Sequence, residues 1–103
     1  MPLTPGDDLE PLMAASGFIA TQTAVDAIRV NLYVVEMTSG NWRWLPLNRR
    51  NPILIDEQGK IMSGHHRLIA ARIAEVIVPA GAVQRFPGIT QRPATAWHDI
   101  LVC

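Results

Sequence analysis

The spacing of apolar residues changes at Gly64, and this change predicts a junction between a strand and a helix. The stretch PILID at residues 52–56 is a short apolar run typical of a strand, and KIMS at residues 60–63 is its expected partner. Gly59 in the intervening EQGK suits a tight turn with a positive φ. On a helical wheel, two later residues fall within roughly 40° of Ile69: Ile73 and Val76. The pattern therefore predicts a hairpin that leads into a helix.

The rest of the chain predicts shorter elements around this unit. Residues 1–22 are expected to form a partly irregular N-terminal arm, because the first dozen positions contain three prolines and three acidic residues. Thr23 followed by Asp26 resembles a capping box and predicts a helix over residues 24–30. Further strands are expected at RVNLYVVEM (29–37), at WRWLPL as an edge strand (42–47) and within VIVPAGAVQRF (76–86). The sum is a small α+β domain over residues 23–103 with a short mixed sheet.

Composition narrows the class of protein. A chain of 103 residues predicts one domain. Hydrophobic residues make up 49% of it and charged residues 17%, which excludes a disordered chain. The formal net charge is zero, so a generally basic nucleic-acid-binding protein is not indicated. A local basic surface stays open, since six of the basic residues lie between positions 43 and 72.

Cysteine content and the chain ends bear on location. The single cysteine, Cys103, excludes an intramolecular disulfide and a cysteine-based zinc site, which suits a reducing compartment. The first residues, MPLTPGDDLEP, lack the pattern of a cleavable signal peptide. No stretch approaches about 18 consecutive apolar residues, so no membrane span is expected. We therefore expect a cytoplasmic protein without a membrane partner.

Polar residues at the start of the predicted helix are candidates for binding an anion. The first amides of a helix lack intrahelical partners and, with the helix dipole, form a positive end. Gly64 has no Cβ to block an approaching anion, and Arg67 offers a planar fork to phosphate oxygens. The imidazoles of His65 and His66 can donate, accept or transfer protons. A phosphate-binding site and a merely solvated helix start are both consistent with these residues.

Residues 52–79 resemble the core of the ParB/sulfiredoxin-like superfamily. In that superfamily a strand–turn–strand hairpin delivers a Gly-x-(His/Arg)-Arg motif to the start of a helix, and the stretch PILIDEQGKIMSGHHRLIAARIAEVIVP has this layout. LNRRNP, residues 47–52, resembles a divergent form of the Asn/Pro/Arg box before the hairpin. His65 stands where a sulfiredoxin has its catalytic cysteine, so repair of cysteine sulfinic acid is not expected. The chain is also too short for the DNA-binding and dimerisation regions of a chromosome-partitioning ParB.

The resemblance implies a site for phosphate chemistry on a nucleotide or nucleic acid, as in a nuclease, an NTPase or a phosphotransferase. The catalytic residues that it implies are His65, His66 and Arg67, with the histidines as general acid or base and the arginine as charge stabiliser. The phosphate-binding residues that it implies are Ser63, Gly64, Arg49 and Arg50. ATP or CTP is the implied ligand and Mg²⁺ or another divalent cation the implied cofactor, with the metal ligands unknown.

The block from residue 40 to residue 71 most resembles small ParB-like domains at the C-termini of bacterial polymorphic toxins. This likeness implies an antibacterial effector that is delivered into the target bacterial cell without a cleavable signal peptide. It also implies a cognate immunity protein as a partner. A housekeeping role for a stand-alone domain fits the composition equally well.

Two other interpretations use the same residues. A non-catalytic nucleotide-responsive module would bind a nucleotide without turning it over. The letters SGHH also resemble the Gly-His-His motif of His-Me-finger nucleases, in which one histidine activates water and another binds a metal. That fold needs a further metal ligand, and the only later histidine is His98.

Several other residues have both a chemical and a structural interpretation. Trp42 and Trp44 alternate on an expected strand, where they suit either base stacking or packing. Glu36, Asp56 and Glu57 are candidates for holding Mg²⁺ beside a triphosphate. Asp56 at the entrance of the hairpin equally suits a turn.

Overall fold

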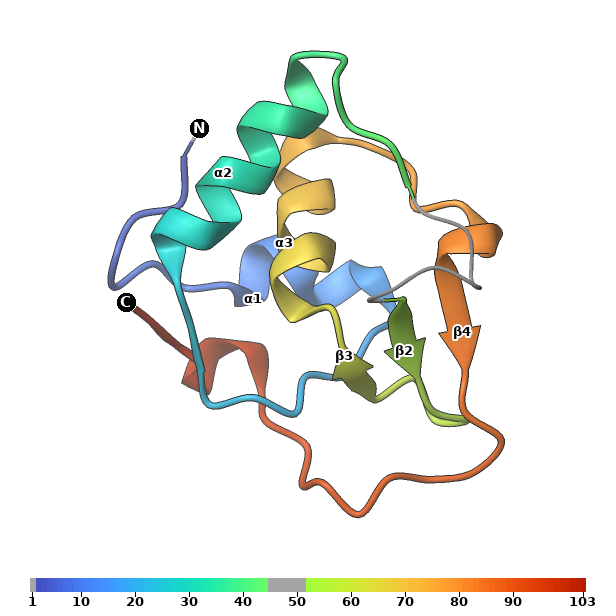
Figure 1. Ribbon diagram of the computed structural model, residues 1–103. Coiled ribbons are helices and arrows are strands. Elements are labelled where there is room, and N and C mark those ends of the chain that lie inside the picture. Colours follow the sequence, from blue (N-terminus) through green and yellow to red (C-terminus); the bar gives the residue numbers. More distant parts are fainter. Residues whose placement is uncertain (1, 45–51) are drawn as a thin grey trace.

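The predicted hairpin and helix are present in the structure, a computed structural model that describes residues 2–44 and 52–103 (Figure 1). Strand β2, Ile53–Ile55, pairs antiparallel with β3, Ile61–Ser63. One residue later, helix α3 begins, and it spans His65–Ala74. The junction between the two is Gly64, as the change in apolar spacing predicts.

The turn of the hairpin is organised by the buried side chain of Asp56. Its Oδ1 accepts hydrogen bonds of 2.9 Å from the backbone amides of Gln58 and Lys60, and its Oδ2 accepts one of 2.9 Å from the amide of Thr90. Gly59 completes the turn with a φ of 87°. Asp56 is therefore a turn former that also fastens the loop around residue 90, and its oxygens are occupied by amides rather than offered to a metal ion.

A mixed sheet is built on this hairpin. Strand β4, Val83–Arg85, lies parallel to β2 on the side opposite β3, which gives the strand order β3-β2-β4. A second, two-stranded parallel sheet joins β1 and β5. The remaining elements are α1 (Glu10–Met13), η1 (Ala14–Ser16), β1 (Ala24–Val25), α2 (Ala27–Thr38), η2 (Ala80–Ala82), η3 (Trp97–Asp99) and β5 (Leu101–Val102). The structure is thus a small α+β domain with short mixed sheets.

The strand predicted over residues 29–37 is wrong, because this stretch lies within α2. Its N-cap is Asp26, whose side chain accepts a hydrogen bond of 2.9 Å from the amide of Ile28, so the cap is not the expected Thr23. The buried residues of the helix are Ala27, Val30 and Met37. Its outer face carries exposed apolar residues, namely Ile28, Leu32 and Val35. These outer residues add apolar positions to the polar side of the helix, so that the stretch is rich in Val, Leu and Tyr in the way that is typical of a strand.

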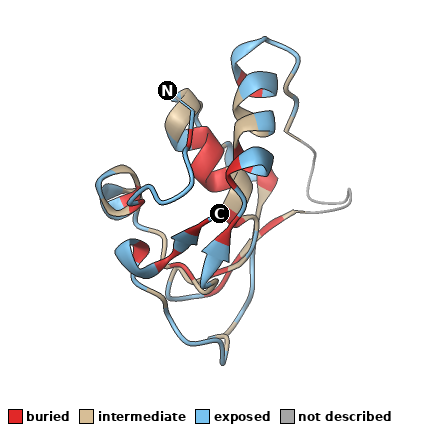
Figure 2. Ribbon diagram, turned by 90° about the vertical axis from the view of Figure 1, so that its left-hand side faces the viewer, coloured by how far each residue is buried: buried red, intermediate tan, exposed pale blue. Residues whose placement is uncertain are grey.

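Helix α3 is the central element of the core. It contacts both α1 and α2, and Figure 2 shows the buried residues gathered on the strands and on the inner faces of the helices. Its buried residues are His65, Leu68, Ile69, Ala70 and Ala71. Of the predicted stripe, only Ile69 is fully buried, while Ile73 and Val76 are half-buried. The helix ends before Val76, because Glu75 turns into the left-handed conformation with a φ of 56°.

The segments at either end of the described chain also contribute to the core. Within residues 2–22, for which the sequence predicts a partly irregular arm, Leu9 and Met13 pack into the same hydrophobic cluster as α3.

The edge strand predicted over residues 42–47 is absent at 42–44, and its other residues lie outside the described part of the chain. In residues 2–44 and 52–103, no helix has the length and apolar character that crossing a membrane requires.

The role of Asp56 gives a prediction for stability. Burial raises the pKa of Asp56, but the amides of Thr90, Lys60 and Gln58 and the charge of Lys60 lower it, so that its pKa lies below the ordinary value. A carboxyl with a lowered pKa binds its proton more weakly in the folded state, so it stabilises the fold above pH about 3.9 and loses that effect as the pH falls further. We expect Asp56→Asn to lower Tm at pH 7 by about 5 °C or more.

The matched control for this prediction is Glu57→Gln in the same turn, since Glu57 is exposed. Thermal denaturation from pH 7 to pH 2.5 is measured for the wild type and both variants. The wild type and Glu57→Gln should lose stability steeply below pH 4, and Asp56→Asn should lose less. An Asp56→Asn protein as stable as the wild type at pH 7 contradicts the role of this side chain.

Candidate functional site

A pocket of about 450 Å³ opens at the N-terminus of α3. The five consecutive residues singled out in the sequence, from Ser63 to Arg67, all line it. The other lining residues come from separate parts of the chain: Gln22, Arg29, Tyr33, Trp42, Met62 and Arg92. The structure therefore brings the predicted motif together with side chains up to 45 residues away in the sequence, as the span from Gln22 to Arg67 shows.

His65 is buried against the segment that precedes β1. Its side chain is 1% exposed, and its Nε2 accepts a hydrogen bond of 3.0 Å from the backbone amide of Thr21. The hydroxyl of Thr21 in turn donates to the carbonyl oxygen of Ile61 at 2.6 Å. Burial, together with the charges of His66 and Arg92, lowers the pKa of His65 to about 4. His65 is therefore a neutral imidazole at neutral pH.

His66 accepts a hydrogen bond of the same kind from a later residue of the same segment. Its Nε2 accepts a hydrogen bond of 3.1 Å from the backbone amide of Asp26, the N-cap residue of α2. Burial is the main cause that lowers the pKa of His66; the charge of Arg29 lowers it further, whereas Asp26 raises it. The two histidines thus attach the start of α3 to the chain that leads into α2.

These hydrogen bonds assign the tautomer of both rings. An imidazole nitrogen that accepts from a backbone amide carries no proton, so the proton of the neutral ring lies on Nδ1. In both histidines the basic lone pair of Nε2 is therefore already engaged. Each neutral ring therefore keeps a donor at Nδ1 and has no free basic nitrogen.

Gly64 is required by the packing beneath the pocket. Its φ of 105° lies in the left-handed region, and a Cβ at this position would meet Cγ1 of Ile53 at 2.9 Å. The close approach to β2 is thus a structural reason for the glycine, and clearance for an anion stays a prediction. The helix N-terminus has no side-chain cap, and intrahelical bonding begins with the amide of Leu68 and the carbonyl of Gly64 at 2.9 Å.

Three arginines from distant segments give the pocket its charge. Arg67 is half-buried, and its Nη2 donates to the carbonyl of Pro52 at 3.4 Å. Burial lowers the pKa of Arg67, Tyr33 raises it and Arg29 lowers it, yet the guanidinium stays charged at neutral pH. Arg92 donates from Nη1 to the carbonyl of Met62 at 2.7 Å. Arg29 projects from α2, and no Asp or Glu occurs among the lining residues that the structure describes.

Three buried polar atoms around this pocket have no hydrogen-bond partner in the described part of the chain. They are Nδ1 of His65, Nε1 of Trp42 and Oε1 of Gln22, and all three residues line the pocket. A buried donor or acceptor left without a partner costs about 1–3 kcal/mol. Their concentration around one cavity is the pattern expected where a polar ligand completes the hydrogen bonding.

Some predicted residues are not among those that the structure describes as lining the site. Arg49 and Arg50 lie outside the described residues. His98, the metal ligand that a His-Me-finger nuclease would need, lines a different pocket, and its ring faces Asp99 at 3.4 Å and Glu10 at 3.9 Å. Within residues 2–44 and 52–103, no three His, Cys, Asp or Glu side chains cluster as a metal site. The described lining thus lacks the carboxylates that a protein-held Mg²⁺ prefers.

Several lining residues were missed in the sequence because they lie far from the motif in the chain. Arg29 and Tyr33 lie four positions apart, so they share one face of a helix as they would share one side of a strand, and neither pattern says that this face meets the start of α3. Gln22 carries no signal of its own, because its position depends on the fold around His65.

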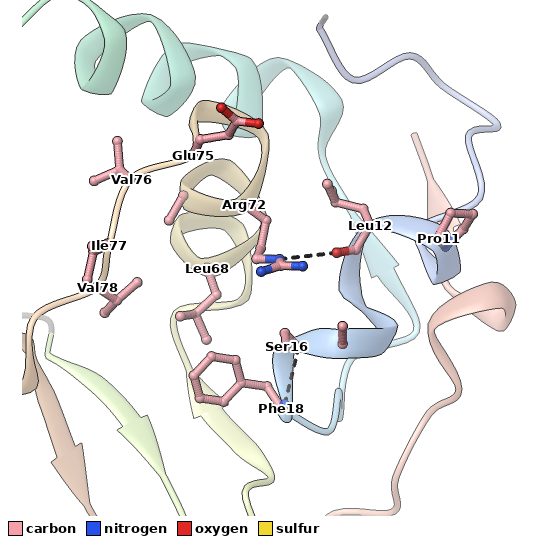
Figure 3. Close-up of a pocket in the computed structure, with 12 residues that line it drawn as sticks. Pro11, Leu12, Ser16, Phe18, Leu68, Arg72, Glu75, Val76, Ile77 and Val78 are labelled. Atoms are coloured by element: carbon pink, nitrogen blue, oxygen red, sulfur yellow. Dashed lines mark hydrogen bonds between the residues drawn. The ribbon is translucent and has the colours of Figure 1, made fainter.

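A larger groove of about 650 Å³ lies on another side of α3 and has a different character (Figure 3). Phe18, Leu68 and Val78 contribute apolar surface to it. Arg72 reaches across it, and its Nε donates to the carbonyl oxygen of Leu12 at 3.2 Å. Of the residues predicted for phosphate chemistry, none of the five that the structure describes, Ser63 to Arg67, lines this groove.

Comparison with known proteins assigns no relative. No protein-family model, no curated protein and no solved structure matches the chain.

The buried His65 predicts a dependence of stability on pH. Its folded pKa of about 4 lies below the unfolded value of about 6.5, so the unfolded state binds a proton first as the pH falls. The stabilisation is complete above pH 6.5 and is lost between pH 6.5 and pH 4. The loss should be of order 2–3 kcal/mol in the free energy of unfolding.

Urea denaturation between pH 7.5 and pH 4.5 measures this loss. His65→Gln should be less stable than the wild type at pH 7.5 and should show a shallower dependence on pH. His98→Gln, at an exposed position, is the control and should follow the wild type. Parallel curves for the wild type and His65→Gln contradict a neutral, buried His65.

Proposed function

We propose that this protein binds the phosphate groups of a nucleotide or nucleic acid in the pocket at the N-terminus of α3. The observation that carries the proposal is the combination of charge and position: Arg29, Arg67 and Arg92 surround an uncapped helix N-terminus, and no acidic residue is described among the lining residues. Guanidinium groups bind phosphate oxygens through charge-assisted hydrogen bonds, and helix amides bind them through the dipole.

The unpartnered Nδ1 of His65 supports an anionic ligand in particular. Because Nε2 accepts from Thr21, Nδ1 carries the proton and is a donor. It is buried and has no partner in the described chain. An oxygen-rich anion supplies acceptors, whereas a cation would supply none.

The layout of the site supports the resemblance to ParB/sulfiredoxin-like domains. The hairpin β2–β3 leads through Gly64 into α3, and Arg67 follows in the first turn. This is the arrangement that the resemblance implies for a loop that cradles nucleotide phosphates. The role as an antibacterial toxin, with an immunity protein as partner, stays a prediction from the same resemblance.

Between binding and catalysis, the geometry favours a nucleotide-responsive binding module. General base catalysis needs an unoccupied lone pair within reach of the proton that it removes. The Nε2 lone pairs of His65 and His66 are engaged by the amides of Thr21 and Asp26, and both pKa values are lowered. The histidines therefore suit the positioning of the loop better than proton transfer.

The second candidate is the enzyme for phosphate chemistry, with His66 and Arg67 as its catalytic residues. The half-buried position of His66 beside Arg67, on the wall of the same pocket, favours it. In that case the bond from Asp26 to His66 would open when substrate binds, which frees Nε2 to take a proton. Arg67 would stabilise the charge that develops on the phosphate.

Binding is tested with Arg67→Ala and inorganic triphosphate. One charge-assisted hydrogen bond contributes about 1.5–3 kcal/mol, so we expect the Kd to rise at least about tenfold. Isothermal titration calorimetry at 50 mM and 200 mM salt measures it, and the wild-type affinity should fall at the higher salt. Circular dichroism checks the fold of the variant.

The matched control is Arg72→Ala. Arg72 lies on the same helix and carries the same charge, but it faces the other groove and binds the carbonyl of Leu12. Its removal should change the Kd less than about twofold. A wild type that does not bind triphosphate, or equal losses in both variants, refutes a phosphate site at Arg67.

A measurement of turnover distinguishes the nucleotide-responsive binding module from the enzyme for phosphate chemistry. We expect ATP, CTP, DNA and RNA to remain intact after incubation with the wild type and Mg²⁺, because neither histidine has a free basic nitrogen. Chromatography of the products is the measurement. If the wild type turns over a substrate, and this activity is lost in His66→Gln but kept in His98→Gln, the protein is an enzyme rather than a binding module. The expected loss is large, because a general base typically contributes about 10²–10⁴-fold in rate.

A further inference from the structure

The outer face of α2 carries an apolar stripe that is largely exposed. It consists of three residues: Ile28 is 72% exposed, Leu32 62% and Val35 63%. Since an α-helix turns by about 100° per residue, these residues lie within roughly 60° of one another. Figure 1 shows α2 along one edge of the fold, and α3 is the helix that it packs against. Single exposed apolar residues are common on protein surfaces, whereas a contiguous group of them marks an interaction surface.

The spacing of the apolar stripe fits another helix. Its members follow one another at intervals of four and then three residues, from Ile28 to Leu32 to Val35. These are the intervals between the core positions of a heptad, along which two helices pack with interlocking side chains. The partner that the stripe fits is therefore a helix with an apolar face of the same spacing.

Charged residues occur on only one flank of the apolar stripe. Arg29 and Glu36 lie seven positions apart and so share that flank. The other flank holds Thr38 and Asn31, and the amide of Asn31 is bonded to the backbone of Leu3 at 2.7 and 2.8 Å. No ion pair of Arg29 or Glu36 occurs in residues 2–44 and 52–103. Both charges are therefore available to a partner that covers the stripe.

These positions are complementary to themselves when two copies of α2 lie antiparallel. A two-fold axis beside Leu32 sets each residue of one helix against the residue equally far along the other, so that Leu32 meets Leu32. Ile28 then lies opposite Val35 of the copy. Arg29 lies beside Glu36 of the copy, and the symmetry makes this ion pair twice. Apolar residues thus meet apolar ones, and each charge meets its opposite.

We propose that two copies of this chain associate through the apolar stripes of α2, with the two helices antiparallel. A parallel arrangement sets Glu36 beside Asn31 of the copy and leaves Arg29 without an opposite charge. An anionic lipid surface favours helices with a basic flank, whereas this flank carries one base and one acid. The helix has only twelve residues, and interfaces of less than about 1,200 Å² are weak and transient. We therefore expect a weak dimer, whose formation does not depend on phosphate binding.

Sedimentation equilibrium of the wild type without ligand, from about 1 μM to about 1 mM, tests the association. The average mass should rise with concentration from 11.4 kDa towards that of a dimer. Leu32→Asp places two like charges at the two-fold axis and should raise the Kd at least about tenfold. The matched control is Ile77→Asp, which makes the same change at an apolar residue that is 87% exposed and lies after α3. It should leave the Kd unchanged, and circular dichroism checks that both variants are folded.

Exchange of the two charges tests the antiparallel arrangement. Arg29→Glu and Glu36→Arg each put like charges into both ion pairs. One exposed ion pair contributes little, but two pairs that change from attraction to repulsion should raise the Kd about tenfold. An equimolar mixture of the two variants brings opposite charges together again in both pairs. The mixture should therefore associate about as tightly as the wild type.

The outcomes decide the proposal without reference to phosphate. A wild type that stays monomeric up to about 1 mM overturns it. A dimer that Leu32→Asp does not weaken uses another surface, which overturns it too. If the two charge variants weaken the dimer and their mixture does not recover it, the antiparallel arrangement is wrong. A monomer that sediments with phosphatidylglycerol vesicles, and loses this in Leu32→Asp, assigns the stripe to a lipid surface instead.

Discussion

Two hydrogen bonds from backbone amides to imidazole nitrogens determine where α3 begins relative to the rest of the fold. His65 accepts from Thr21 and His66 accepts from Asp26, so adjacent residues of one helix bind two points of one distant segment. The amide of Asp26 belongs to the N-cap of α2, which means that the same contact also orients the second helix. Neutral imidazole is suited to this, since it accepts at one nitrogen and donates at the other. Paired histidines at a helix start thus have a structural role that their chemistry alone does not suggest.

The charge of the candidate site is a consequence of this attachment. With α2 held beside the start of α3, Arg29 comes to the same cavity as Arg67. The loop fastened by Asp56 at Thr90 is followed by Arg92, which lines this cavity too. The chain as a whole has no net charge, yet the described wall of this cavity is entirely basic among its ionised side chains. Local concentration of charge, rather than overall charge, is what attracts an anion to one place on a small protein.

The parts of the fold that the sequence predicted correctly are those that depend on neighbours in the chain. The turn at Asp56 and Gly59 and the break at Gly64 are specified within a few residues, so the hairpin and α3 follow from local signals. Helix α2 was assigned wrongly because Leu32 and other outward residues are apolar, and the chain pattern does not tell which apolar residues face the core. Whether an apolar residue is buried depends on what packs against it, and that is a property of the whole fold.

For the site, the sequence by itself determined one contiguous part: the five residues from Ser63 to Arg67 that line the pocket, together with the helix start that carries them. Only the tertiary structure decided that the histidines accept backbone amides and so lose their free basic nitrogens. It also decided that Gly64 is required by Ile53, and that Arg29 joins the motif from another helix. The physical reason is one of range. Turn and helix signals act over a few residues, whereas burial, tautomer and pKa depend on groups that are distant in the chain and adjacent only after folding.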